Sequence, residues 1–431
     1  VDNDISRMGA SGISVARFFD LAAQPDFITV DRLTIEENRI RDCMRLELTE
    51  IPPTLREYSG YGGIALADGE YLVIRSNSIE GNGSEQLSPI CGVFILHGEG
   101  IALDGNRILH NGRPADPEVS SLPGQRGGVI IGLARPRTVP VAPFGSSFSG
   151  SRQDGVPAVR VHDNIVVSPE GRALKMFVVG PVTVEGNELT AHGSNSLRRT
   201  PLPGASTGAA GFDVTNAAGV PYSVRSRTTN PLAAFLDVLG GAVVSIVNLG
   251  VSNEIYLQLI GLSGLGLVDR FSDPTGKDDD ARLFANGNIL FNDNQVVLDA
   301  FGPVVTLNLC SVLLFSLDDI SMSGNQCDCD LVIDLVGTNA LVMGWSVRVA
   351  DNRFKEGFFN AFLSAFTIGL MNSTTDNQGT HCFVRVGVPI LSVLEPNRSL
   401  VEYFNKSACG PFASARAKLM QRTGMKISEN Q

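Results

Sequence analysis

A short unit centred on asparagine recurs along this chain and constrains its fold more than any other feature of the sequence. In the copy from Ile101 to Gly112, apolar residues alternate at Ile101 and Leu103, a polar turn follows around Asn106, and an apolar residue returns at Ile108. Alternation with period two is typical of a β-strand with one buried face. Each unit therefore predicts a short strand, a tight turn and a second short strand.

Copies of the unit recur at intervals of tens of residues, the mark of a solenoid. From Asn77 to Asn106 the step is 106 − 77 = 29 residues, and from Asn164 to Asn187 it is 187 − 164 = 23. The 164 − 106 = 58 residues between Asn106 and Asn164 are interpreted as two steps of 29. The predicted turn positions are Asn38, Asn77, Asn106, Asn164, Asn187, Asn325, Asn352 and Asn377.

Asparagine suits such a turn for two reasons. It tolerates the left-handed backbone conformation better than most residues. Stacked coils would also place equivalent asparagine side chains about 4.8 Å apart, which allows a ladder of amide hydrogen bonds. Asparagine is common in any turn, so a single copy would indicate little. Repetition at comparable spacing favours a stack of coils over unrelated turns.

The repeat resembles that of the right-handed parallel β-helix proteins of the pectate-lyase-like superfamily, over about Ile28 to Val388. The resemblance implies an all-β fold. That superfamily contains polysaccharide lyases, glycoside hydrolases, phage tailspikes and adhesins, so the fold implies no single activity.

The pattern divides the chain into a β-helix and two ends. Residues 1–27 are expected to form an N-terminal cap, with a short amphipathic helix from Ile13 to Leu21. The β-helix occupies residues 28–388. Proline-rich or Gly/Ala-rich lateral loops interrupt it at 114–157 and 190–235, and a strand at Gly128–Leu133 lies within the first of these. Residues 389–431 are expected to form a partly helical cap, with a basic helix from Phe412 to Arg422.

Composition limits the partners. The chain has 431 residues and a formal net charge of −11, which argues against nucleic acid and anionic membranes as general partners. The most apolar stretch, Leu232 to Val251, contains Asp237 and a glycine pair, and predicts buried strands and no membrane span. A protein or a polysaccharide is the expected partner, in an oligomer or larger assembly. We expect an extracellular or cell-surface location, although the chain begins at Val1 without a signal peptide.

The seven cysteines do not form a recognisable framework. An odd number spread over a long chain is not typical of a disulfide scaffold. Cys327 and Cys329 lie two residues apart and would share one face of a strand. We expect them to pack as small buried hydrophobic residues and not to bind a metal. We expect no cofactor.

Candidate binding residues lie in the interruptions of the repeat. Two tyrosines among glycines could stack on sugar rings, and arginines occur in both lateral loops; the alternative is that they only pack or solvate these loops. The candidates are Tyr58, Tyr61, Arg135, Arg137, Arg198 and Arg199.

Catalytic motifs are not recognisable. Arg135 and Arg137 flank a proline, as in a pectate-lyase signature, but their spacing is too short for it. Asp318 and Asp319 are the best candidate for the carboxylate pair of a glycosidase. Adjacent strand residues point to opposite faces, however, so we expect a turn there.

These patterns favour a non-catalytic structural or adhesive β-helix that presents lateral loops to a glycan or protein partner, with the coils as scaffold. Two alternatives are retained. The first is a carbohydrate-active lyase or hydrolase. The second is a spike or fibre subunit of a phage-like tail or injection apparatus.

Overall fold

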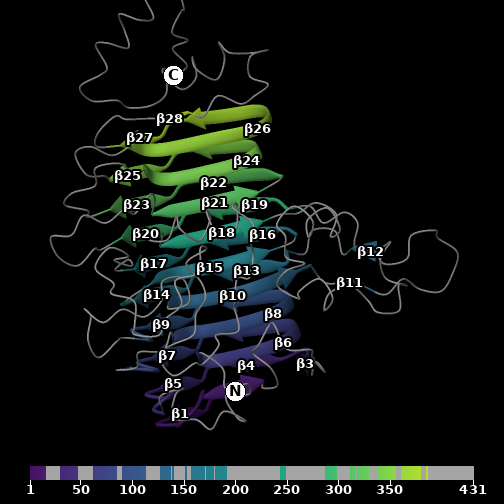
Figure 1. Cartoon of the computed structure of the whole chain (residues 1–431), viewed down its shortest axis with the longest axis vertical. Coiled ribbons are helices and arrows are strands. Elements are labelled where there is room, and N and C mark those ends of the chain that lie inside the picture. Colours follow the sequence, from purple (N-terminus) through teal and green to yellow (C-terminus); the bar gives the residue numbers. More distant parts are fainter. Residues whose placement is uncertain are drawn as a thin grey trace, which may run out of the picture.

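The computed structural model shows a stack of β-coils whose long axis follows the sequence from the N-terminus towards the C-terminus (Figure 1). All strand pairs are parallel except one in the described part of the chain. The described residues form strands, turns and bends, and no helix. The structure describes residues 1–15, 30–46, 62–84, 90–112, 127–136, 138–139, 151–152, 157–169, 171–178, 180–191, 243–248, 287–298, 311–316, 318–329, 338–355, 361–379 and 385–386.

The strands form three faces, and equivalent strands of successive coils are neighbours. Four long strands, β6, β8, β24 and β26, bend partway and contribute to both face 1 and face 2. Face 1 contains β2 (Ile13–Val15), the first part of β6 (Gly62–Arg75) and of β8 (Cys91–Asp104), β10 (Gly127–Arg135), β15 (Arg172–Val178), β18 (Val244–Asn248), β21 (Val312–Ser316), the first part of β24 (Thr338–Ala350) and of β26 (Ala361–Thr375), and β28 (Arg385–Val386).

Face 2 continues each coil beyond the bend. It contains β3 (Val30–Asp31), β4 (Thr34–Glu36), the second parts of β6, β8, β24 and β26, and β13 (Val159–His162), β16 (Val182–Glu185), β19 (Ile289–Asn292) and β22 (Asp319–Ser323).

Face 3 is the ten-stranded sheet, in which strands are ordered as in the sequence. It contains β1 (Asp4–Ser6), β5 (Arg39–Arg41), β7 (Ser78–Glu80), β9 (Arg107–Leu109), β14 (Ile165–Ser168), β17 (Glu188–Ala191), β20 (Gln295–Leu298), β23 (Gln326–Cys329), β25 (Arg353–Lys355) and β27 (Gln378–Gly379). The predicted all-β parallel solenoid is confirmed.

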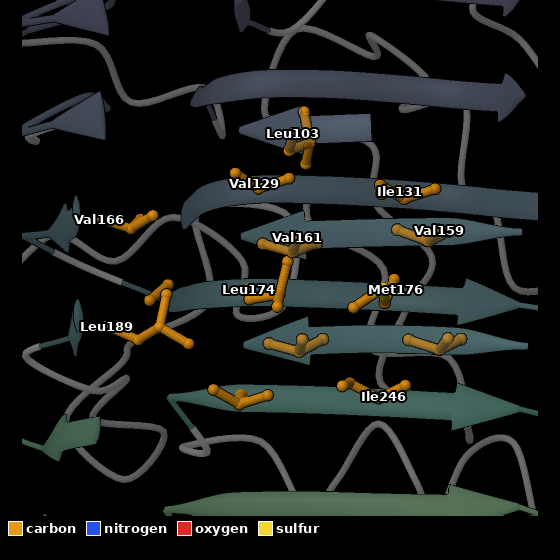
Figure 2. Close-up of a cluster of buried hydrophobic side chains, with 14 of the residues drawn as sticks. Leu103, Val129, Ile131, Val159, Val161, Val166, Leu174, Met176, Leu189 and Ile246 are labelled. Atoms are coloured by element: carbon orange, nitrogen blue, oxygen red, sulfur yellow. The ribbon is translucent and has the colours of Figure 1, made fainter. Parts of the chain in front are cut away.

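The core is a continuous column of aliphatic side chains inside the coils. Along face 2, Val161, Val184 and Phe291 are neighbours in register, and each is at most 1% exposed. Figure 2 shows side chains from the three faces, among them Val129, Val159 and Leu189, gathered in this interior. Alternation with period two therefore selects the buried residues, as the sequence pattern predicts.

An asparagine ladder closes the corner between faces 2 and 3, which we call the asparagine corner. In each step the side-chain oxygen of one asparagine accepts hydrogen bonds from the backbone N–H and the side-chain NH₂ of the preceding one. Asn164 accepts both from Asn106, at 2.9 Å each. The ladder comprises Asn3, Asn38, Asn77, Asn106, Asn164, Asn187, Asn294, Asn325, Asn352 and Asn377. The predicted amide ladder is confirmed, and it includes Asn3 and Asn294, which the sequence pattern missed.

The left-handed residue of this corner is not the asparagine, contrary to the sequence interpretation. It is the residue before it: φ is 52° at Asp163, 54° at Asp293 and 68° at Gly324. The asparagine is buried and points inwards, where its amide bonds to the next coil and to carbonyls such as that of Leu103. The chain changes direction at the residue before the asparagine, so that residue is the one that adopts positive φ.

Two further expectations about the repeat need correction. Asn106 and Asn164 bond directly to each other, so the 58 residues between them form one enlarged coil and not two. Within the expected N-terminal cap, residues 1–15 supply β1 and β2, which pair with β5 and β6. The expected helix at Ile13–Leu21 begins as a strand, and residues 16–21 lie outside the described ranges.

A second, shorter ladder lies at the corner between faces 3 and 1. Asn82 donates from its backbone N–H and its side chain to the side-chain oxygen of Asn111, at 3.1 and 2.8 Å. The backbone N–H of Cys43 donates in turn to Asn82. Cys43 thus replaces an asparagine at one end of this ladder. Burial raises the pKa of its thiol, which favours the neutral form.

The glycines of β10 provide a test of how closely the coils approach. A methyl group on Gly128 would collide with the Val166 side chain and lie 2.6 Å from the Ala173 carbonyl oxygen. We expect Gly128→Ala to lower the free energy of unfolding by about 3 kcal/mol through overpacking. Gly105, with φ of 62° and no neighbouring atom closer than 4.0 Å, is the control. Gly105→Ala should cost only about 1 kcal/mol for its left-handed backbone. Urea unfolding of both variants measures the difference, and equal losses would contradict it.

Candidate functional surface

The coils vary in length, but the asparagine corner does not. Successive ladder asparagines lie 23 residues apart at Asn164–Asn187 and 107 apart at Asn187–Asn294. In both coils one left-handed residue and one asparagine join face 2 to face 3. The additional residues therefore enter at the other two corners, between faces 3 and 1 and between faces 1 and 2.

The corner between faces 1 and 2, which we call the variable edge, is one of the two corners at which coil length changes. Face 1 passes to face 2 within a few residues between β15, ending at Val178, and β16, beginning at Val182. The same corner takes up the chain between β10 and β13 and between β18 and β19. Within the first of these, β11 (Thr138–Val139) and β12 (Ser151–Arg152) form an antiparallel pair beside the stack (Figure 1). β10 therefore divides the predicted lateral loop at 114–157 into two parts. The part before β10 belongs to the corner between faces 3 and 1, and the part after β10 belongs to the variable edge. The predicted strand at Gly128–Leu133 is confirmed as part of β10.

Outward side chains differ sharply among the three faces. On face 1 they are buried and mostly apolar: Phe94 is 2% exposed, Leu313 0% and Phe315 7%, and the polar Lys175 and Ser245 are buried in the same column. On face 2 the outward register column carries the polar residues Thr34, Arg160, Thr183, Ser321 and Arg348, together with Val73, Ala102 and the exposed Leu290. On face 3 it carries Arg39, Glu188, Gln295 and Arg353. Among the described residues, a partner in solution would therefore meet mainly polar side chains on faces 2 and 3, with Leu290 as an exposed apolar residue on face 2.

Ion pairs connect neighbouring coils on face 2. Arg75 bonds to Glu36 of the preceding coil at 2.7 Å, and Arg160 bonds to Asp104 at 2.5 Å. The bond to Glu36 raises the pKa of Arg75. Both arginines are about half exposed, so these pairs orient side chains more than they stabilise the fold.

Asp318 and Asp319 do not form a facing carboxylate pair. Asp318 lies in the bend before β22, where its carboxylate accepts backbone N–H bonds from Gly287 at 3.2 Å and Asp319 at 3.0 Å. The bond from Gly287 connects the bend to the preceding coil. Asp319 is exposed and begins β22. The two carboxylates have different local roles, because one is engaged by backbone and the other faces solvent.

Of the remaining sequence candidates, the structure describes only Arg135. Arg135 ends β10, opposite Glu99 of β8 in the backbone register. Tyr58, Tyr61, Arg137, Arg198 and Arg199 lie outside the described residues, as do the expected C-terminal cap and nearly all of the loop at 190–235. Cys43, Cys91 and Cys327 are buried, and burial is what the packing role expected of Cys327 requires. Over the ranges that the structure describes, no group of three or more His, Cys, Asp or Glu could hold a metal ion.

Sequence reasoning missed one exposed residue. Trp345, the single tryptophan of the chain, lies where β24 bends at the variable edge, and it is 51% exposed. It has the same strand parity as Val347 and Val349, which are buried, so alternation alone places it inside. Its rarity was the only signal available in the sequence.

Comparisons with known proteins give no relative. No family model, no curated protein and no solved structure matches this chain. Within the described ranges, no helix is long and apolar enough to span a membrane.

Proposed function

We propose that this chain is a non-catalytic adhesive solenoid that holds a glycan or protein partner along its variable edge. The observation that carries the proposal is the contrast between corners. The asparagine corner keeps one construction, whereas coil length changes several-fold at the other corners. A solenoid accepts such insertions because each coil contacts mainly its neighbours, and long insertions in compact domains commonly serve binding.

The polar groups support binding without catalysis. The ladder asparagines are consumed in internal hydrogen bonds, and the Asp318 carboxylate is engaged by backbone N–H groups. A glycosidase needs two carboxylates facing across one bond. The same proposal includes a right-handed coil, kinship with the pectate-lyase-like superfamily and an extracellular location. The observation that supports these three points is the parallel stacking of the coils.

A replacement within the enlarged coil tests the proposal. Ala134 pairs with Val178, and Val159 pairs with Val182, so residues 135–157 can be replaced by the Val-Gly of 179–180. The intact chain should be retained in gels that contain one of pectin, alginate, glucan or mannan, and it should release no reducing ends. The replaced chain should melt within a few degrees of the intact one, because loop length changes closure entropy only slowly, and its retention should fall at least threefold.

Three results would contradict the proposal. Unchanged retention of the replaced chain would remove this segment from the binding surface. A large loss of melting temperature would assign it to packing. Product release by the intact chain that disappears on Asp319→Asn would indicate a hydrolase.

A further inference from the structure

Trp345 presents an apolar ring to solvent from a fixed backbone. The backbone N–H of Trp345 donates to the Asp318 carbonyl of the preceding coil at 2.9 Å. The neighbouring Gly344 is closely packed, since a methyl group there would lie 3.0 Å from Ile320 and 3.2 Å from the Asp318 carbonyl oxygen. The backbone that carries the indole is therefore held on two sides, while half of the residue remains exposed.

An isolated exposed hydrophobic residue requires no explanation, so the surroundings of Trp345 matter. Ser346 pairs in register with Asp319, and Arg348 pairs with Ser321. Asp319 and Arg348 are exposed on face 2. From Trp345 to Arg348 the strand covers about 10 Å, at roughly 3.3 Å per residue. An indole, two hydroxyls, a carboxylate and a guanidinium thus share one small area of the surface.

The two charged groups in this area differ from others on the same face. Arg75 and Arg160 are each bonded to an acidic side chain of the preceding coil. No such bond joins Arg348 or the Asp319 carboxylate to another side chain within the described residues. Their hydrogen-bonding capacity is available to a ligand, and exposed guanidinium and carboxylate groups bond readily to hydroxyls.

We propose that Trp345, Asp319, Ser321 and Arg348 form a binding platform for a neutral saccharide chain. A sugar ring has an apolar face, which can pack on indole, and a rim of hydroxyls, which can bond to the acid and the guanidinium. One positive and one negative group leave the platform without a preference for a charged ligand, and the net charge of −11 disfavours polyanions. This inference rests on the proposed adhesive function and specifies its ligand class.

The single tryptophan makes the test direct, because all tryptophan emission comes from the platform. The full chain is titrated with cellohexaose, laminarihexaose, maltohexaose and mannohexaose, and quenching of Trp345 by acrylamide is measured. At least one hexasaccharide should reduce the quenching constant twofold or more in a saturable manner. Calorimetry with that hexasaccharide should show binding lost in Trp345→Ala and at least tenfold weaker in Arg348→Ala and Asp319→Ala.

Controls separate this site from general surface binding. Arg353→Ala and Glu188→Ala remove exposed charges from face 3 and should leave the affinity unchanged. The absence of protection by all four hexasaccharides would overturn the platform, as would affinity unaffected by Arg348→Ala and Asp319→Ala. Tighter binding of hexagalacturonate would overturn the neutral ligand class. Retention of the chain by a polysaccharide gel without hexasaccharide protection would leave the adhesive function standing and remove only this site.

Discussion

Replacing Asn164 with alanine should lower the free energy of unfolding by about 3–5 kcal/mol, because several buried polar groups would lose partners that water cannot replace. Its side-chain oxygen accepts from the backbone N–H and the side-chain NH₂ of Asn106. Its NH₂ donates to the Leu103 carbonyl at 2.8 Å, the His162 carbonyl at 2.9 Å and the Asn187 side-chain oxygen at 3.0 Å. Alanine supplies none of these bonds.

The first asparagine of the ladder is the matched control. Asn3 makes the same kind of bond to Asn38, at 2.8 Å, but it is exposed at the N-terminal end of the stack. Water can satisfy the groups that Asn3→Ala leaves behind, so the loss should stay below about 1 kcal/mol. Urea unfolding gives both free energies. The dependence of the free energy of unfolding on urea concentration should be the same in both variants and the parent, which checks that the extent of unfolding is unchanged. Similar losses at Asn3 and Asn164 would show that burial does not set the strength of the ladder.

Much of the ladder was predictable from the sequence, and its missed members show why the rest was not. Asn294 carries the local pattern, with Ile289 and Phe291 before it and Val296 after it, and all three are buried. It was missed because 107 residues separate it from Asn187, which removes the spacing that identifies a repeat. Local alternation remains valid across an insertion, whereas spacing does not.

The left-handed turn residue was readable but was assigned to the wrong position. Asp163, Gly186, Asp293 and Gly324 all precede a ladder asparagine, and Asp and Gly are residues that accept positive φ. The sequence therefore carried a two-residue signal, of which only the asparagine was used. The exposure of Trp345 could not be predicted in this way, because it depends on the bend of β24, where the pairing with β26 shifts register after Gly344.

A charge placed inside the coil should have the largest effect of all. Val184 is fully buried between Val161 and Phe291 of the adjacent coils. We expect Val184→Asp to prevent folding, since an unpaired carboxylate in this interior costs several kcal/mol or more, a large part of the 5–15 kcal/mol that stabilises an ordinary domain. Val349→Asp, at another fully buried position, should behave alike. The third predicted interior position, Leu317, lies outside the described residues.

The neighbouring residue makes a strict control, because strand parity alone separates the two sites. Thr183 precedes Val184 in β16 but points outwards on face 2, so Thr183→Asp should yield soluble protein that melts within a few degrees of the parent. Val184→Ala, which keeps the site apolar, should fold with a loss of about 2–3 kcal/mol and gives a measurable value if the Asp variant yields no protein. Circular dichroism and thermal melting distinguish these outcomes. Cooperative melting of Val184→Asp near the parent temperature would mean that the interior of the coil is not closed to water at this position.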